Sequence, residues 1–268
     1  MNILILGDVM GASGRKAVKI NLKKIIQEKK IDFTIVNGEN SADDGRGITK
    51  QIADEFFMDG VDVITSGNHI WDKNETTTFI SEENRLLRPA NFAEGSPGRG
   101  YGIYESKSKK FRIAVINLMG NVFMRKTEDV FLSALDLQKK IKLKENSDFI
   151  VVDFHGEITS EKMAMGHFYD GKATLVVGTH THVPTADSRI LNGGTAYQTD
   201  IGMCGDYDSV IGMNKANSIL KFLKDKNAKQ HFPSVGEATI SGIIVNADEK
   251  TGLAIKVERL VEGGVFKN

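Results

Sequence analysis

Four of the six histidines in this 268-residue sequence lie in short motifs that follow apolar, strand-like runs. The motifs are Gly67-Asn68-His69, Phe154-His155-Gly156-Glu157 and Gly178-Thr179-His180-Thr181-His182. Two imidazoles separated by one residue can point at one centre if the backbone bends there. Histidine is the commonest metal ligand and a frequent general acid or base, so this clustering favours a shared functional site over isolated structural histidines.

Carboxylate and amide side chains occupy the same kind of position. Asp8 follows the first apolar run, Glu39 and Asn40 follow the second, and Asn68 follows the third. Because the carboxyl ends of the strands of an α/β sheet meet at one edge, we expect these groups to converge with the histidines. A mixed imidazole and carboxylate set suits Fe, Mn or Zn, whereas Ca²⁺ and Mg²⁺ prefer oxygen ligands. Six or seven such ligands predict two ions rather than one.

Such a pair of ions indicates the chemistry. Two metals about 3.5 to 4 Å apart stabilise the attacking and leaving oxygens of a phosphoryl displacement, and they lower the pKa of a bridging water. The sequence therefore predicts hydrolysis of phosphate esters. We expect Glu39 to bridge the ions, because a shared carboxylate offsets the repulsion between two close dications. If the oxygen of Asn68 binds metal, the neighbouring His69 is free to act as the general acid.

Seven short runs rich in β-branched residues predict the strands that position these groups, at residues 3–6, 33–36, 61–65, 113–117, 149–153, 174–177 and 242–246. Amphipathic patterns predict helices at 16–29, 49–58 and 127–144. Residues 238–260 alternate around the turn signal 248–252, which predicts an antiparallel hairpin. Alternating strands and helices indicate a layered α/β fold. The length suits a single domain over residues 1–268.

Composition narrows the class of protein. Lysine plus arginine number 35 and aspartate plus glutamate also 35, so no bulk positive field favours long nucleic acid or an anionic membrane as the partner. The single cysteine, Cys204, and an opening stretch without the features of an export signal lead us to expect a cytoplasmic protein. The apolar runs are far shorter than the roughly 20 residues that cross a bilayer. We also expect a homo-oligomer.

The motifs resemble those of the calcineurin-like metallophosphoesterases, and more closely the YmdB-type bacterial phosphodiesterases. Gly67-Asn68-His69 and the spacing of His180 and His182 agree with the wider superfamily. Met10 stands where the superfamily has a ligand histidine, and Glu39-Asn40 replaces its second aspartate motif. Those departures are similar to the YmdB-type subgroup, and the likeness runs over essentially the whole chain, including Gly7-Asp8-Val9-Met10-Gly11, Arg88-Pro89-Ala90-Asn91 and Asp200-Ile201-Gly202-Met203.

The resemblance implies a sandwich of central β-sheets flanked by helices. It also implies one metal held by Asp8, Glu39, Asn40 and His182, and a second held by Glu39, Asn68, His155 and His180, with His69 as the proton donor. Members of this subgroup are described as di-iron or manganese-dependent phosphodiesterases of cyclic nucleotides, including 2′,3′-cyclic phosphates. The replaced first-motif histidine leaves the identity of the metal open, because that ion gains oxygen ligands; we expect two divalent transition metal ions, Fe or Mn.

Two alternative functions stay open at this stage. A phosphomonoesterase or 5′-nucleotidase would use the same two-metal core, and a regulatory protein could use the metals only to bind a nucleotide. Among neighbouring residues, Asp72 is a candidate to orient His69, and Glu157 and Asp187 are candidates to orient ligand histidines. His167 and His231 belong to no motif and are expected to be structural or surface residues.

Overall fold

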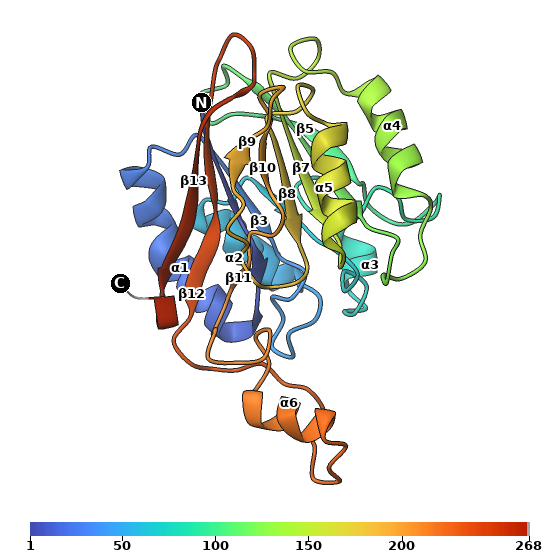
Figure 1. The fold of residues 1–268 in the computed structure, drawn as a ribbon, viewed down its shortest axis with the longest axis vertical. Coiled ribbons are helices and arrows are strands. Elements are labelled where there is room, and N and C mark those ends of the chain that lie inside the picture. Colours follow the sequence, from blue (N-terminus) through green and yellow to red (C-terminus); the bar gives the residue numbers. More distant parts are fainter. Residues whose placement is uncertain (267–268) are drawn as a thin grey trace.

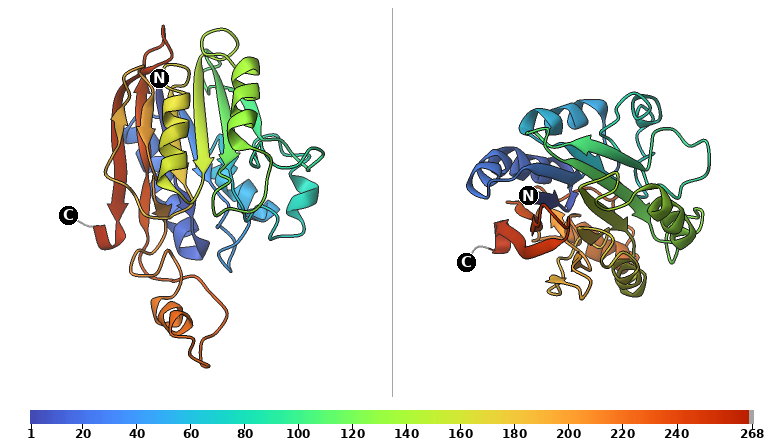
Figure 2. Two further views of the ribbon diagram at one scale, coloured as in Figure 1. Left: turned by 45° about the vertical axis from the view of Figure 1, so that its right-hand side comes forward. Right: turned by 90° about the horizontal axis from the view of Figure 1, so that it is seen from above.

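Two β-sheets lie face to face at the centre of the structure, and helices cover the outer face of each (Figures 1 and 2). The computed structural model describes residues 1–266, so the last two residues of the domain predicted over 1–268 lie outside the described part. The layered α/β sandwich predicted from the sequence is confirmed. No helix within residues 1–266 is both long and apolar enough to cross a membrane.

The first sheet has the strand order β13-β12-β1-β3-β4. Its strands are β1 (Asn2–Leu6), β3 (Phe33–Asn37), β4 (Val63–Thr65), β12 (Thr239–Ala247) and β13 (Ala254–Gly263). β1, β3 and β4 are parallel, and β12 and β13 form the predicted antiparallel hairpin. Helices α1 (Gly11–Glu28) and α2 (Lys50–Asp59) bury apolar side chains against this sheet, including those of Val18, Leu22 and Phe56.

The second sheet has the order β5-β6-β7-β8-β10-β9. Its strands are β5 (Tyr101–Glu105), β6 (Arg112–Met119), β7 (Phe149–His155), β8 (Leu175–Thr179), β9 (Arg189–Ile190) and β10 (Ala196–Gln198). Helices α4 (Val130–Lys140) and α5 (Thr159–Phe168) cover its outer face. The remaining elements are the paired short strands β2 (Asp8–Val9) and β11 (Met203–Cys204), helices α3 (Thr76–Phe79) and α6 (Lys215–Phe222), and a final 3-10 turn (Gly264–Phe266).

Apolar side chains from both sheets share one core layer. Ile3, Ile5 and Phe33 of the first sheet lie in the same buried cluster as Val115 and Val151 of the second. Alternate residues of β1 point instead toward the helices, so both faces of the strand are covered and its sequence reads as a continuous apolar run. One core shared by both sheets is typical of a single domain. The assignment of residues 1–268 to a single domain stays a prediction.

The predicted boundaries differ from the structure at several helices. α1 begins at Gly11 rather than at residue 16. α4 occupies only 130–140 of the predicted 127–144. It begins at 130 because the side chain of Asp129 caps its N-terminus by accepting from the amide of Leu132. The sequence analysis predicts neither α5 nor α6. Met165 and Gly166 are the buried apolar residues of α5. Two such residues give the sequence of this helix only a weak amphipathic pattern.

Candidate metal centre

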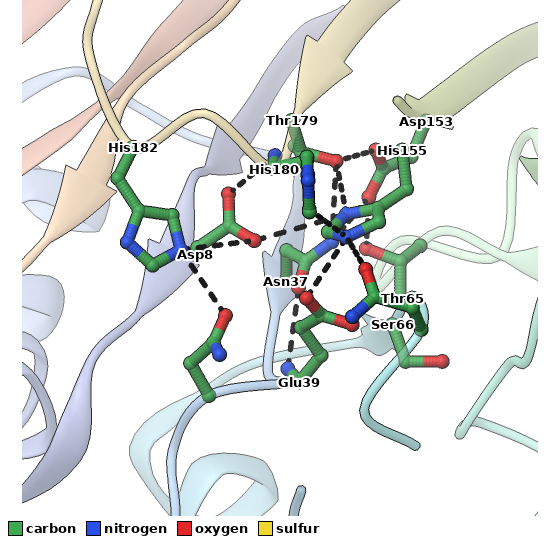
Figure 3. Close-up of polar contacts among 12 residues, drawn as sticks. Asp8, Asn37, Glu39, Thr65, Ser66, Asp153, His155, Thr179, His180 and His182 are labelled. Carbon is green, nitrogen blue, oxygen red and sulfur yellow. Dashed lines mark hydrogen bonds and ion pairs between the residues drawn. The ribbon is translucent and has the colours of Figure 1, made fainter. Parts of the chain in front are cut away.

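The seven predicted ligands meet at the carboxyl edge of the parallel strands (Figure 3). Asp8 begins the short strand β2, with one residue between it and the end of β1, Glu39 and Asn40 follow β3, and Asn68 follows β4. From the second sheet come His155, the last residue of β7, and His180 and His182, which follow β8. The two sheets therefore supply opposite sides of one site.

One group of ligands surrounds Nε2 of His155. This atom lies 2.8 Å from Oε1 of Glu39, 3.1 Å from Oδ1 of Asn68 and 3.1 Å from Nδ1 of His180. At most one or two protons can lie among these four atoms, so they cannot all be satisfied by hydrogen bonds with one another. A cation accepts every lone pair at once, and Glu39, His155 and His180 offer ligand atoms that all lie within 4.8 Å of one another.

A second group contains Asp8, Asn40 and His182. Nε2 of His182 lies 3.2 Å from Oδ1 of Asn40 and 3.9 Å from Oδ1 of Asp8. Oδ1 of Asp8 is buried and has no hydrogen-bond partner within residues 1–266, while its Oδ2 accepts from the backbone amide of His180. A buried carboxylate oxygen without a partner is costly, so this atom fits a metal ligand.

A buried relay fixes the ring of His155. Nδ1 of His155 lies 2.9 Å from Oγ1 of Thr179, and Thr179 donates its own hydroxyl proton to Asp153 over 2.7 Å. Asp153 also accepts from Thr65 and Asn37. Since the hydroxyl proton of Thr179 is already used, the ring donates from Nδ1 and leaves Nε2 free as a ligand atom. The sequence analysis did not identify Asp153, because it lies inside a strand that reads as uniformly apolar.

The backbone bends at both histidines of the paired motif, as their shared centre requires. His180 and His182 have φ values of +96° and +65°, in the left-handed region that non-glycine residues rarely adopt. Nδ1 of His182 donates to the carbonyl of Ile211 at 2.8 Å, and Nε2 of His180 lies 3.0 Å from Oε2 of Glu157. These contacts turn Nε2 of His182 and Nδ1 of His180 toward the cluster.

Of the two carboxylates predicted to orient ligand histidines, only Glu157 does so. Asp187 accepts from the hydroxyls of Thr185 and Thr199 and pairs with Arg189, so its prediction is wrong. Asp187 follows the segment that carries His180 and His182. Its hydrogen bonds with Thr185 and Thr199 hold this segment against the end of β10. His167 is exposed on α5 and takes no part in the centre, as predicted.

Gly67 explains how two ligand groups approach so closely. A Cβ atom built at this position would overlap the imidazole of His155 and the carboxylate of Glu39. Only glycine leaves room for both side chains beside the turn that carries Asn68.

His69 lies beside the cluster in a different hydrogen-bonding setting. Its backbone amide donates to Oε2 of Glu39 at 3.1 Å, and its Nδ1 lies 2.7 Å from Oδ2 of Asp72. Arg125 lies 3.4 Å from the other oxygen of Asp72. The prediction that Asp72 orients His69 is confirmed, and the contact leaves Nε2 of His69 available for proton transfer.

Burial and charge shift the titration of the cluster in opposite directions. Burial raises the pKa of Asp8 to about 6, against the effect of the nearby histidines. Burial also opposes charge on Glu39 and His155, but their mutual attraction and hydrogen bond outweigh it, so the pKa of Glu39 falls to about 2 and that of His155 rises to about 9. Without metal, a proton on His155 therefore balances the carboxylate of Glu39, and a bound cation would take its place.

A two-sheet α/β sandwich with carboxylate, amide and imidazole side chains gathered at its strand ends defines a phosphatase of the metallophosphoesterase type. Comparison with known proteins agrees. The family model described as "YmdB-like protein" matches residues 4–260, and the chain belongs to this family.

Individual relatives cover nearly all of the chain. It is 44% identical over 261 residues to a protein of Bacillus subtilis named "2′,3′-cyclic-nucleotide 2′-phosphodiesterase", covering 97% of each. A crystal structure of a hypothetical protein from Thermus thermophilus superimposes with a TM-score of 0.89 at 34% identity, covering 98% of this chain and 100% of the other. A structure described as a novel phosphatase of Mycoplasma pneumoniae gives 0.88 at 36% identity, covering 99% and 95%.

Proposed function

We propose that this protein hydrolyses phosphodiester bonds of cyclic nucleotides, 2′,3′-cyclic or 3′,5′-cyclic, with two divalent ions, Fe or Mn. The observation that carries the proposal is the crowding of Glu39, Asn68 and His180 around Nε2 of His155, beside the unpartnered oxygen of Asp8. The activity named for the B. subtilis relative, at 44% identity, supports the choice of substrate.

The two groups of side chains would hold the two ions. Asp8, Asn40 and His182 would bind one, and Asn68, His155 and His180 the other, with Glu39 bridging them. When bound, such a pair neutralises charge on the phosphoryl oxygens and makes hydroxide available near neutral pH. The donor set of three nitrogens and four oxygens suits Fe or Mn.

The chain's own residues complete the reaction. As water adds to phosphorus, the bond from phosphorus to the ribose oxygen breaks, and His69 would give that oxygen the proton held at Nε2. Asp72 accepts a hydrogen bond from Nδ1 of His69 at 2.7 Å and so holds the ring in place. Glu39 accepts from the backbone amide of His69, which fixes the distance between the proton donor and the metal ligands. For a 2′,3′-cyclic phosphate opened at O2′, the product is a nucleoside 3′-phosphate.

Metal analysis of the purified protein, coupled to a diesterase assay, tests this proposal. We expect about two ions per chain and metal-dependent cleavage of bis-p-nitrophenyl phosphate. Asn68→Ala and His155→Ala should abolish that cleavage, while His167→Ala, an exposed histidine on α5, should retain it. Full activity in both ligand variants would overturn the assignment. His69→Ala should keep its metal and lose rate on substrates with poor leaving groups.

Two measurements separate the alternatives. A phosphomonoesterase would prefer p-nitrophenyl phosphate over the diester, and a nucleotide-binding regulator would bind nucleotide tightly without turnover in metal-replete protein. Two features favour catalysis over nucleotide binding alone. One is the second group of ligand candidates, Asp8, Asn40 and His182, and the other is His69, which lies beside the cluster without belonging to either group. The cytoplasmic location and the homo-oligomer remain predictions, the latter open to light scattering coupled to gel filtration.

A further inference from the structure

A cavity of about 280 Å³ lies beside the metal-ligand cluster. Glu39, His69, His180 and His182 form part of its wall, and the rest comes from the loop around Arg46 and from the segment that carries α6. Figure 1 shows that α6, which lies between β11 and β12 in chain order, projects below the two sheets. The hydrogen bond from His182 to Ile211 explains one contact of this segment with the ligand candidates, and the further side chains that the segment adds to the cavity wall call for another explanation.

Both added walls are bonded to metal-ligand candidates. Asn40 donates from Nδ2 to the carbonyl of Gly45, the residue before Arg46, at 2.9 Å. His182 donates to the carbonyl of Ile211 in the α6-bearing segment at 2.8 Å. A molecule bound in the cavity is therefore held at a fixed position relative to the cluster.

Two residues in the wall of this cavity carry polar atoms without hydrogen-bond partners. Ser218 on α6 is only 1% exposed, yet its Oγ has no hydrogen-bond partner within residues 1–266. Nδ1 of His231 is likewise buried and unpaired across the described chain. Leaving such atoms unsatisfied costs about 1 to 3 kcal/mol each, so either side chain would gain free energy by turning its polar atom toward a ligand in the cavity.

The imidazole of His231 can either donate or accept. Its pKa is lowered by burial and by the positive charges of Lys221 and Arg46, so the ring is neutral at pH 7. Arg46 itself also lines the cavity, and its guanidinium forms no ion pair or hydrogen bond with any residue in the range 1–266. It is suited to a phosphate oxygen.

The remaining wall is apolar. Met10, Ile211, Met213 and Phe222 line it, and Phe222 is 83% exposed although it is aromatic. Met10 occupies the position at which the wider superfamily has a ligand histidine, so an apolar side chain here adds to the cavity rather than to the metal site. An exposed ring at the mouth of a cavity provides a surface on which a base can stack.

We propose that this cavity binds one nucleoside unit of the substrate, with the base stacked on Phe222 and its polar edge paired with Ser218 and His231. The inference rests on the proposed function, because the phosphate of that nucleoside would lie at the metal ligands. A nucleobase has apolar faces and a polar edge, which matches the two kinds of wall. At about 280 Å³ the cavity lies near the lower limit for ligand pockets, so it suits a mononucleotide rather than an RNA chain.

Binding measurements on metal-replete protein test the inference. Calorimetry with adenosine 3′-phosphate and with inorganic phosphate should show that the nucleotide binds at least roughly tenfold more tightly, since stacking contributes about 1 to 3 kcal/mol per base. Phe222→Ala should remove most of that advantage, and Ser218→Ala should reduce it about fivefold. Ser147→Ala provides a matched control, because Ser147 is another buried serine whose Oγ has no partner and it does not line the cavity.

The outcomes distinguish this inference from the proposed function. Equal affinity for nucleotide and phosphate in wild-type protein that cleaves bis-p-nitrophenyl phosphate would overturn the nucleoside site and leave the diesterase intact. An unchanged preference in Phe222→Ala would also overturn it, and loss of folding cannot explain that result because the ring is mostly exposed. Absence of diesterase activity in metal-replete wild type would instead refute the proposed function.

Discussion

The relay behind His155 gives the sharpest mutational test of how the centre is built. Thr179→Val replaces a buried hydroxyl by a methyl group of nearly the same size. It removes the acceptor of the His155 Nδ1 proton at 2.9 Å and the donor to Asp153 at 2.7 Å. The packing of β8 stays the same, so the variant isolates the hydrogen bonds.

The expected magnitude follows from the two groups that each lose one hydrogen-bond partner, His155 and Asp153. An unpaired buried donor or acceptor costs about 1 to 3 kcal/mol. Asp153 keeps its hydrogen bonds from Thr65 and Asn37, which reduces its share, so we expect a total loss of about 2 to 4 kcal/mol in the free energy of unfolding. Losing the partner of a ligand histidine should also weaken metal binding roughly 10- to 100-fold.

Thr34→Val is the matched control. Thr34 is as buried as Thr179, but its hydroxyl has no hydrogen-bond partner within residues 1–266. Urea denaturation of metal-free protein and calorimetric titration with Mn²⁺ should show a control change within about 0.5 kcal/mol and unchanged metal affinity. If Thr179→Val behaves like Thr34→Val in both assays, the relay does not position His155 and the reasoning is refuted.

Three further predictions concern other parts of the site. Asp72→Asn should lower kcat roughly 10-fold or more by removing the carboxylate that holds the ring of His69 at Nδ1, with metal content unchanged by elemental analysis; an unchanged kcat would contradict it. Lys162→Met should destabilise the protein by about 3 to 5 kcal/mol in urea, because it leaves Asp200 buried without its ion-pair partner at 2.6 Å; a change below about 1 kcal/mol would contradict it. Metal binding should release protons and strengthen from pH 6 to pH 9, because His155, whose pKa is about 9, is protonated before loading and must lose that proton; calorimetry in buffers of different ionisation enthalpy measures this, and pH-independent affinity would argue against it.

The elements that position the site were predictable because buried parallel strands have a distinctive sequence. All seven predicted strands exist, and each ends close to a residue of the cluster or in the shared core. Since parallel strands place their carboxyl ends at one edge of a sheet, the convergence of Asp8, Glu39 and Asn68, which follow strands of the first sheet, was predictable. His155 joins them from the second sheet, which that rule does not cover. The sequence analysis expected the backbone to bend if His180 and His182 point at one centre. The positive φ values of both residues show that bend.

The parts that escaped prediction depend on contacts between distant segments. Asp153 supports the centre from inside β7, and its polar partners Thr65 and Asn37 come from the facing sheet. Glu157 and Asp187 each follow a motif histidine in the sequence, yet only the fold decides which one reaches a histidine. His231 reads as an isolated histidine until the segment around α6 brings it to the wall of the cavity.

The central claim is that seven side chains from both sheets hold two metal ions that share Glu39. Anomalous diffraction from a crystal soaked in Mn²⁺ tests it directly. The account predicts two peaks about 3.5 to 4 Å apart, one beside Asp8 and His182 and the other beside His155 and His180. A single peak away from Glu39, or none at these side chains, would contradict it.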